Sequence, residues 1–282
     1  MPETRWQPGP AWLFCPADRP ERYTKALAAA DVVIVDLEDA VAPDRKAAAR
    51  DALHGLVADG TFHRDRTVVR VNAADSPEHP ADLALADELA LDRLMLAKAE
   101  HPDAVAALRH EVIVLLETPR GVAHAVDLAA QANVIGVMWG ADDLIAGLGG
   151  FASRREDGSY RDVAVHARSQ SLIAAKAAGR LALDSVYMDI PDLDGLRAEA
   201  DDAVACGFDA KVAIHPTQTT VIRAAYRPAP ERLEWARRLL AHVGTERGVT
   251  TFEGRMVDGP IYAQAERIVR LTALTDDMEG GR

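Results

Sequence analysis

Eight short aliphatic runs, separated by stretches of helical composition, are the feature that most constrains how this chain can fold. The runs occupy residues 12–14, 32–37, 67–71, 94–96, 111–117, 134–139, 185–190 and 210–214. The stretches between them, such as 44–56 and 169–183, are rich in Ala, Leu and Arg, as amphipathic helices are. Continuous β-branched strands that alternate with helices indicate a parallel sheet buried on both faces. Eight such units favour a closed (β/α)8 TIM barrel over an open doubly wound sheet.

The chain continues well beyond its eighth predicted strand. A helix is expected at 231–243, a turn-rich stretch at 244–260 and a last helix from about Ile261. We therefore expect a barrel catalytic domain at residues 1–225 and a C-terminal helical extension at 226–282. Within the barrel, the Gly- and charge-rich segment 146–161 is longer than a usual βα loop, so it either shapes the mouth or is a passive insertion.

Charge and cysteine content exclude several classes of protein. The formal net charge of -12 would repel a polyanion, so we expect no nucleic-acid partner. The cysteines, Cys15 and Cys206, are too few for a disulfide framework or a thiolate metal site, which suits a reducing compartment. The first residues lack a secretory pattern, and no apolar run reaches the roughly 18 residues of a membrane span. These features predict a cytoplasmic protein without a membrane segment.

Charged side chains gather where the predicted strands end. In barrel enzymes the working residues come from the C-terminal ends of the strands. A charge at the rim of an aliphatic barrel must pair, bind a metal or meet a charged ligand, and a structural ring of ion pairs is the alternative for any single residue. The residues at these ends are Asp36, Glu38, Asp39, Arg70, Asn72, Lys98, Glu117, Asp142, Asp143 and His215.

The carboxylates in this set, with no accompanying cysteine, predict a hard cation. Glu117 and Asp143 are the best pair of Mg²⁺ ligands, because they end neighbouring strands. Glu38 and Asp39 are expected to hold the waters of the metal, or else to act as a helix cap or an ion pair. Lys98 is expected to neutralise these carboxylates, and His215 is expected either to close its strand or to take part in catalysis.

The order of the motifs carries a family resemblance over nearly the whole length. The matching segments are 13–26, 31–41, 68–72, 95–100, 115–121, 139–144, 207–218 and 252–260, which include VVIVDLEDAV, LLETPRG, WGADDL and FEGRMVDGP. In these segments the chain resembles the citrate lyase β-subunit-like group of the HpcH/HpaI aldolase/citrate lyase family. That family also includes malyl-CoA lyases and thioesterases.

The resemblance implies a role for several residues. It implies Mg²⁺ ligation by Glu117 and Asp143, with Arg70 gripping the carboxylate of the substrate. It also implies contacts from Arg19 and Lys25 to coenzyme A. A homotrimer is implied as well, in which the C-terminal extension of one subunit is a lid over the mouth of its neighbour and supplies Asp258 as a catalytic residue.

The expected activity is a Mg²⁺-dependent lyase or thioesterase acting on a small carboxylated 3-hydroxyacyl-CoA, such as malyl-CoA or citramalyl-CoA. In cleavage a base removes the hydroxyl proton of the substrate, whereas in hydrolysis Asp258 activates a water. Two alternatives remain open: a citryl-CoA lyase-type subunit of a citrate lyase complex, and a pyruvate or oxaloacetate aldolase that works without coenzyme A. The acyl group, its stereochemistry and the balance of lysis and hydrolysis are left undetermined.

Overall fold

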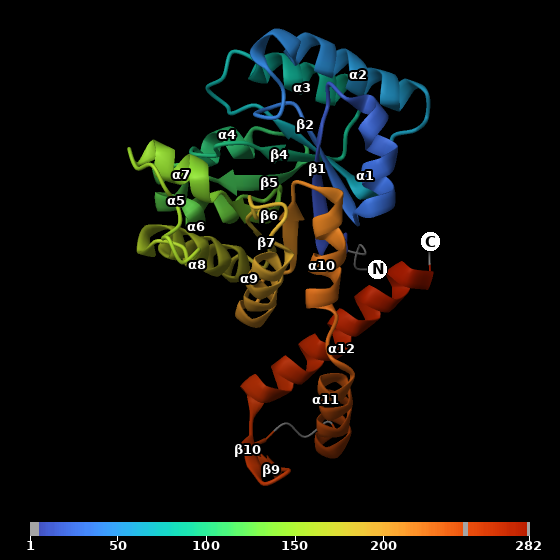
Figure 1. Cartoon of the computed structure of the whole chain (residues 1–282), viewed down its shortest axis with the longest axis vertical. Helices are drawn as coiled ribbons and strands as arrows, with labels where there is room; N and C mark the ends of the chain where they lie inside the picture. The colour runs from blue at the N-terminus through green and yellow to red at the C-terminus, as the bar shows by residue number, and fades with distance from the viewer. Residues whose placement is uncertain (1–5, 245–247, 281–282) are drawn as a thin grey trace.

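The computed structural model describes residues 6–244 and 248–280, and within that part of the chain eight parallel strands close into a barrel in sequence order (Figure 1). Each strand pairs with its sequence neighbours, and β1 also pairs with β8. The strands are β1 (Ala11–Pro16), β2 (Val32–Asp36), β3 (Thr67–Val71), β4 (Arg93–Leu96), β5 (Glu111–Leu116), β6 (Val134–Trp139), β7 (Leu181–Asp184) and β8 (Ala210–Ala213). The predicted (β/α)8 TIM barrel is confirmed.

Helices fill the connections between the strands and cover the barrel. The α-helices are α1 (Tyr23–Ala29), α2 (Lys46–Ala58), α3 (His79–Glu88), α4 (Pro102–Ala106), α5 (Pro119–Ala123), α6 (Ala125–Ala129), α7 (Ala141–Gly147), α8 (Asp162–Ala177), α9 (Leu193–Cys206) and α10 (Pro216–Tyr226). Short 3-10 turns precede α1, α2 and β3 at Pro20–Arg22, Pro43–Arg45 and Arg64–Arg66. Among the residues that the structure describes, no helix has the length and apolar character needed to cross a membrane.

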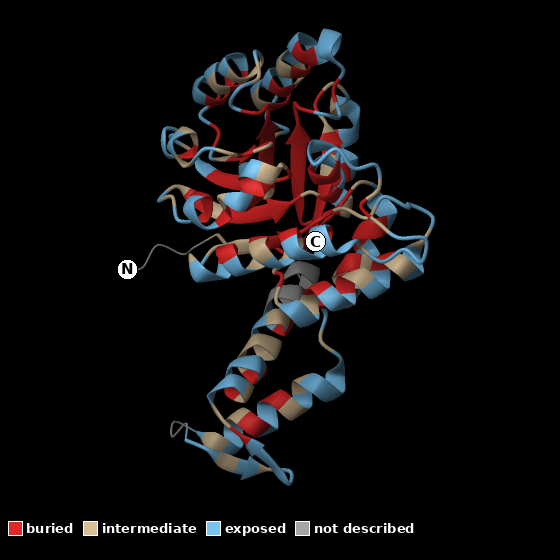
Figure 2. Cartoon of the chain, turned by 90° about the vertical axis from the view of Figure 1, so that its left-hand side faces the viewer, coloured by how far each residue is buried: buried red, intermediate tan, exposed pale blue. Residues whose placement is uncertain are grey.

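Alternation along the strands divides the buried side chains into two layers. Inward-facing residues such as Trp12, Ile34 and Leu115 fill the barrel interior. Outward-facing residues such as Val33 and Val69 join the apolar faces of the surrounding helices in a larger core. The strands are accordingly buried along almost their whole length (Figure 2). This rigid framework fixes where each strand delivers its last residue.

The seventh strand lies earlier than the sequence pattern predicts. We expected a strand at 185–190 and a helix through 169–183, but α8 ends at Ala177 and β7 spans Leu181–Asp184. Gly179 has a positive φ of 65°, which terminates the helix and turns the chain into the strand. The apolar run at 185–190 is loop, so that prediction was wrong.

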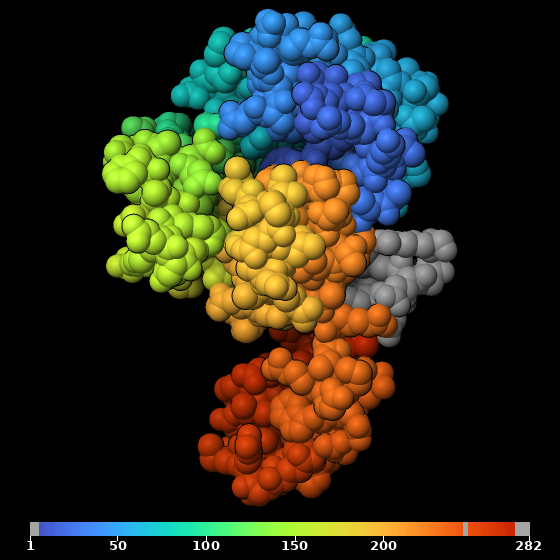
Figure 3. Space-filling model, in the orientation of Figure 1, coloured from blue at the N-terminus to red at the C-terminus, as the bar shows by residue number. Residues whose placement is uncertain are grey.

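The chain leaves the barrel after α10 and forms a projection. Helix α11 (Pro230–Val243) packs against α12 (Gly259–Gly280), and a hairpin of β9 (Thr250–Phe252) and β10 (Arg255–Val257) joins them. Residues 230–244 and 248–266, here termed the C-terminal lobe, have a small core of their own around Leu239, Val257 and Tyr262. The lobe stands clear of the barrel body in both orientations (Figures 2 and 3).

Helix α12 returns to touch the barrel at its base. Arg267 donates a hydrogen bond to the carbonyl of Phe208 at 2.8 Å and lies 3.6 Å from Asp209. These two residues lead into the start of β8, which is the end of the barrel opposite to the strand C-termini. The C-terminal lobe is therefore attached on the side away from the strand-end carboxylates.

Candidate active site

Arg70 and Asp36 form the innermost pair at the strand C-termini. They are register partners on β3 and β2, and both side chains point into the barrel. The Arg70 Nε donates to Asp36 Oδ1 at 2.7 Å, and its Nη2 donates to Oδ2 at 2.6 Å. Asp36 also accepts from the backbone amides of Glu38 and Ala40. This bidentate contact fixes the plane of the guanidinium.

The aromatic ring of Phe14 lies beneath the same guanidinium. The Arg70 Cζ is 4.6 Å from the ring centroid, a cation–π distance. Burial alone would lower the pKa of Arg70. The negative charges of Asp36, Glu38 and Glu117 together have the larger effect, and they raise this pKa above its ordinary value. Arg70 is thus a permanently charged, oriented cation at the floor of the mouth.

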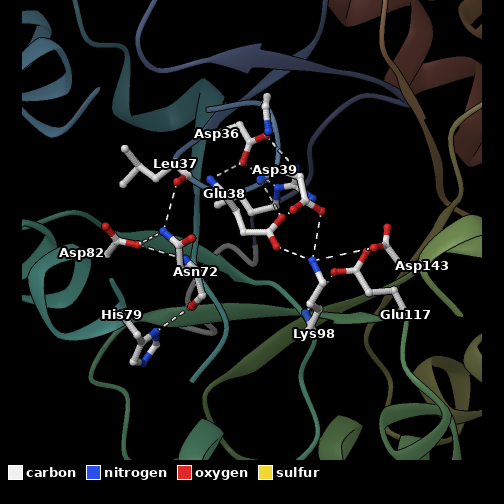
Figure 4. A network of polar contacts seen from close by, with 12 residues as sticks. Asp36, Leu37, Glu38, Asp39, Asn72, His79, Asp82, Lys98, Glu117 and Asp143 are labelled. Carbon is white, nitrogen blue, oxygen red and sulfur yellow. Dashed lines mark hydrogen bonds and ion pairs between the residues drawn. The ribbon is translucent and has the colours of Figure 1, made fainter. Parts of the chain in front are cut away.

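Glu38 and Asp39 come next, in the turn that follows β2, and both contact Lys98 (Figure 4). Glu38 Oε2 lies 3.2 Å from Arg70 Nη1 and accepts from the amide of Asp39, while its Oε1 contacts the Lys98 ammonium. Lys98 Nζ donates to Asp39 Oδ2 at 3.0 Å. Burial raises the pKa of Glu38 despite its two cations. In the more open Asp39, Lys98 outweighs burial and lowers the pKa.

Lys98 connects this group to the ends of β5 and β6. Its backbone has a positive φ of 49°, which is uncommon for a residue with a side chain. In that conformation its amide donates to Glu117 Oε1 at 3.0 Å, while its ammonium lies 3.8 Å from Asp143 Oδ1. One residue therefore contacts Glu38, Asp39, Glu117 and Asp143.

Glu117 is the most perturbed carboxylate of the set. It follows the last residue of β5 and is only 3% exposed. Burial, together with repulsion from Asp143 and Glu38, raises its pKa to about 8 although Arg70 and Lys98 oppose the change. Its position also requires the neighbouring glycine, because a Cβ at Gly140 would lie 2.9 Å from Glu117 Oε2. The sequence GADD after β6 thus leaves space for the carboxylate of β5.

The two aspartates that open α7 have different surroundings. Asp142 accepts a 2.6 Å hydrogen bond from Ser153 and so anchors the loop before α8. Asp143 is half-exposed and faces Lys98 and Glu117 (Figure 4). Of the pair, Asp143 is the one with carboxylate oxygens directed at the mouth.

The residues present fit a divalent cation between Glu117 and Asp143. A buried carboxyl group that repels its neighbour is stabilised as an anion when a cation lies between them. Among the described residues, no group of three or more His, Cys, Asp or Glu side chains is arranged to hold a metal. A pair of carboxylates is nonetheless the donor set that Mg²⁺ commonly takes, the rest being waters and substrate oxygens.

The other predicted residues lie away from this cluster. Arg19 and Lys25 are exposed, in the turn after β1 and on α1. His215 caps α10 through Thr217 and Gln218, which accounts for its place at the end of β8. Asp258 lies between β10 and α12 in the C-terminal lobe, and is not among the residues gathered at the mouth.

Sequence reasoning missed two layers of this site. Phe14 was hidden within an apolar run, and its aromatic character was the only available signal. Lys46 lies within a stretch of helical composition and was not singled out, yet it is buried and contacts the turn that carries Glu38. Asp36 was noted at its strand end, but its pairing with Arg70 required the strand register.

The chain matches the HpcH/HpaI aldolase/citrate lyase family over residues 11–216. It is 54% identical over 263 residues to the citrate lyase subunit beta-like protein of Mycobacterium tuberculosis, covering 93% of this chain and 95% of that protein. It is 33% identical over 256 residues to the (3S)-malyl-CoA thioesterase of Cereibacter sphaeroides, covering 87% and 88% respectively.

Solved structures agree with the sequence comparison. The crystal structure of CitE from Mycobacterium tuberculosis in complex with magnesium, acetoacetate and coenzyme A superposes with a TM-score of 0.88. The sequences are 53% identical, and the alignment covers 94% of this chain and 98% of that one. The likeness thus includes the C-terminal lobe as well as the barrel.

Proposed function

Because the chain belongs to the HpcH/HpaI aldolase/citrate lyase family, and is an enzyme of that family, we propose that it is a Mg²⁺-dependent lyase or thioesterase acting on a small carboxylated 3-hydroxyacyl-CoA such as malyl-CoA or citramalyl-CoA. The observation that carries the proposal is the buried Glu117, facing Asp143 and Arg70 at the barrel mouth. The malyl-CoA thioesterase relative and the complex of CitE with magnesium and coenzyme A support the same chemistry.

Glu117 and Asp143 are the proposed metal ligands. When bound, Mg²⁺ would polarise the substrate oxygens and supply positive charge where negative charge develops in the reaction. Lys98 keeps Glu38 and Asp39 turned towards the same space, and those carboxylates are the proposed acceptors for the waters of the metal. A hard, oxygen-rich centre of this kind suits a hydroxy acid and not a soft ligand.

Arg70 is the proposed clamp for the free carboxylate of the substrate. Asp36 accepts one hydrogen bond from the Arg70 Nε and one from Nη2, and the Glu38 carboxylate lies beside Nη1. Each Nη carries two N–H groups, so donors remain for an incoming carboxylate. Since Asp36 fixes the guanidinium plane, these donors are oriented before the substrate binds.

Two reactions share this arrangement. In cleavage of malyl-CoA, loss of the hydroxyl proton to a base breaks the adjacent carbon–carbon bond, which releases glyoxylate and leaves the acetyl-CoA carbanion to be protonated. In hydrolysis, a water adds to the thioester carbonyl and coenzyme A leaves as the thiol. Asp258 is the proposed group that activates this water.

We infer that Asp258 acts on the mouth of a neighbouring subunit. The contact of Arg267 with Phe208 attaches α12 to the base of its own barrel. Asp258 lies nine residues earlier, about 13 Å further along the helix axis at 1.5 Å per residue. That end of α12 points away from the barrel body (Figure 1). Asp258 therefore serves a second copy of the chain, in agreement with the homotrimer that we propose.

Exposed apolar side chains support this assembly. Phe151, in the loop that follows α7 beside the mouth, is 99% exposed, and Met188 in the loop after β7 is 59% exposed. On the C-terminal lobe, Met256 is 70% exposed and Val249 74% exposed. Apolar groups on both surfaces suit a lid docked over the mouth of a neighbour. We propose residues 226–282 as that lid and residues 1–225 as the catalytic barrel.

The coenzyme A portion is assigned to the side of the mouth nearest β1. Arg19 and Lys25 follow this strand and extend exposed cationic side chains that suit the phosphates of coenzyme A. If the enzyme worked as a free aldolase on pyruvate or oxaloacetate, replacing these two residues by alanine would leave its activity unchanged.

A substrate panel tests the proposal directly. Purified protein is incubated with Mg²⁺ and a set of 3-hydroxyacyl-CoA thioesters, and the products are separated as free acid plus coenzyme A or as keto acid or aldehyde plus acyl-CoA. We expect turnover that EDTA abolishes and that Glu117→Gln and Asp143→Asn reduce by at least about 100-fold. Turnover of malyl-CoA that persists in EDTA and in both variants would contradict the metal site. Activity appearing only with an acyl-carrier partner would instead indicate a citrate lyase subunit.

A further inference from the structure

Lys46 is a buried lysine that points at the backbone of the active-site turn. It begins α2, nine residues after Leu37, and its side chain returns to the end of β2. Its Nζ donates to the carbonyl of Leu37 at 2.8 Å and to the carbonyl of Glu38 at 2.7 Å. A third bond, at 3.0 Å, goes to Asn72 Oδ1 at the end of β3. Its ammonium thus has an oxygen for each of its N–H groups.

Asn72 completes the same support from the β3 side (Figure 4). Its Nδ2 donates to the carbonyl of Leu37 at 3.0 Å and to Asp82 Oδ2 at 2.6 Å. Asp82, which is 1% exposed, also accepts hydrogen bonds from the backbone amide of Asn72 and from the Arg50 guanidinium. The carbonyl of Leu37 therefore receives Lys46 and Asn72 together, and the turn is tied to both β2 and β3.

The orientation of this turn decides where Glu38 lies. Its backbone amide is held from the other side by Asp36, whose carboxylate also holds Arg70. The carbonyls accept from Lys46, and also from Asn72 at Leu37 and from the Val41 amide at Glu38. With both faces of the peptide fixed, the Glu38 carboxylate is directed to Arg70 Nη1 and to Lys98. Without Lys46, the carbonyl of Leu37 keeps its bond from Asn72 and that of Glu38 keeps its bond from the Val41 amide, so the turn would persist but be held less firmly.

From these contacts we propose that Lys46 is a positioning residue for the reaction, which holds the Leu37–Glu38 peptides so that Glu38 and Arg70 keep their reactive orientation. The inference rests on the proposed function for its kinetic consequence. Here all the acceptors are uncharged oxygens, so the ammonium orients the turn instead of neutralising a carboxylate.

Lys211 provides a matched control. It is a buried lysine too, 0% exposed against 8% for Lys46, and it donates to Asp184, to the carbonyl of Ser185 and to Glu199. It lies on the outer face of β8, whereas the turn that carries Glu38 follows β2. Lys46→Met and Lys211→Met each remove a buried ammonium with three oxygen partners, so both are expected to lower the melting temperature.

The kinetic test compares the two variants on the substrate that the panel identifies. We expect Lys46→Met to lower kcat by about 10- to 100-fold with KM changed less than about threefold, the range typical of groups that orient metal-site residues. Lys211→Met should keep kcat within about threefold of the original enzyme. Restoring an ammonium of the same length, by aminoethylation of Lys46→Cys, should recover kcat. An equal loss of kcat in both methionine variants would overturn the proposal.

A second measurement does not depend on activity. Hydrogen exchange, followed by mass spectrometry, reports the amides of Glu38 and Ala40, which donate to Asp36. We expect faster exchange in the peptide spanning this turn in Lys46→Met and unchanged exchange there in Lys211→Met. Unchanged exchange in Lys46→Met would refute the positioning role even if the enzyme proved inactive on every thioester. Faster exchange together with an inactive original enzyme would refute the proposed function alone.

Discussion

Lys98 is where the contacts of the mouth converge. Its left-handed backbone costs free energy of the order of 1 kcal/mol, which the surrounding contacts must offset. They do so through Glu38, Asp39 and Glu117, which contact its ammonium and its amide. The strained conformation sends the amide and the ammonium to different carboxylates at once. With an ordinary extended backbone, the amide and the side chain of residue 98 would point in other directions, and these contacts would not form together.

Arg70→Lys tests the bidentate geometry separately from charge. A lysine keeps the positive charge, but it cannot match the two oxygens of Asp36 or a substrate carboxylate with parallel N–H groups. We expect kcat/KM to fall by about 10- to 100-fold, since a hydrogen bond to a charged group contributes roughly 1.5–3 kcal/mol. Steady-state kinetics on the identified thioester provides the measurement.

Arg93→Lys is the control for this substitution. Arg93 pairs with Glu111 at 2.9 Å at the start of β4, at the other end of the barrel. Its replacement should leave kcat/KM within about twofold. If Arg70→Lys were as active as Arg93→Lys, a bidentate clamp at Arg70 would be ruled out.

Individual residues differ in how far the sequence could place them. The strand-end rule brings Glu38, Lys98 and Glu117 to one rim, because their positions depend only on where strands stop. The contact between Asp36 and Arg70 depends on register, and that of Lys46 depends on how α2 packs back onto β2. Neither the register nor the packing is encoded in a local pattern, so these partners could not be predicted.

At the scale of elements, a second buried polar cluster joins β6, β7 and β8 to the helices outside them. Asp184 accepts from the indole of Trp139, from Arg168 on α8 and from Lys211 on β8. Its carboxylate is fully buried, which would raise its pKa, but Lys211 and Arg168 outweigh burial and lower it. This cluster fixes α8 and the loops above it relative to the barrel.

The lowered pKa of Asp184 makes its contribution depend on pH. A carboxyl group whose pKa is lower in the folded state stabilises the fold above its unfolded pKa, near 3.9, and loses this contribution as the pH falls through the folded value. Asp184→Asn should therefore lower the melting temperature clearly at pH 7, where it leaves buried cations unpaired. The difference from the original protein should shrink steadily below about pH 4. Thermal denaturation at several pH values measures it, and a constant difference down to pH 3 would contradict the assignment.

The strands were largely predictable and their exceptions have a local cause. Seven of the eight predicted runs overlap observed strands, because β-branched residues buried on both faces leave an uninterrupted apolar pattern. β7 was not predicted because Leu181–Asp184 continues the Ala-rich composition of the preceding helix. Gly179 is the only signal of a break between helix α8 and strand β7. The apolar run that follows, including Met188, lies in an exposed loop.

At the scale of the whole molecule, the C-terminal lobe projects from the base of the barrel. Helix α12 contacts the barrel there, next to the start of β8 and opposite to the strand C-termini where Glu117 lies. The sequence predicted an extension beyond the barrel from the surplus length alone. Its direction could not be predicted, because it depends on where α12 touches the barrel.

Mixed oligomers test whether the site is shared. Arg70→Ala and Asp258→Ala chains should each be nearly inactive as pure assemblies. When they are mixed by unfolding and refolding together, some mouths combine an intact Arg70 with an intact Asp258 from the neighbour, so activity should return. For random trimers we expect recovery to roughly a quarter of the original activity, since both partners of a site must be intact. No recovery, with mixed assembly verified by native mass spectrometry, would contradict a site built from two chains.

The attachment of α12 has a practical consequence for measurement. If each mouth is closed by another copy, turnover per chain depends on how many chains are assembled, and specific activity falls when the enzyme is diluted below the dissociation constant of the assembly. A progress curve recorded at nanomolar enzyme would then show slow inactivation that added inert protein does not prevent. A higher enzyme concentration would restore the specific activity, so the dependence of activity on enzyme concentration would measure subunit association.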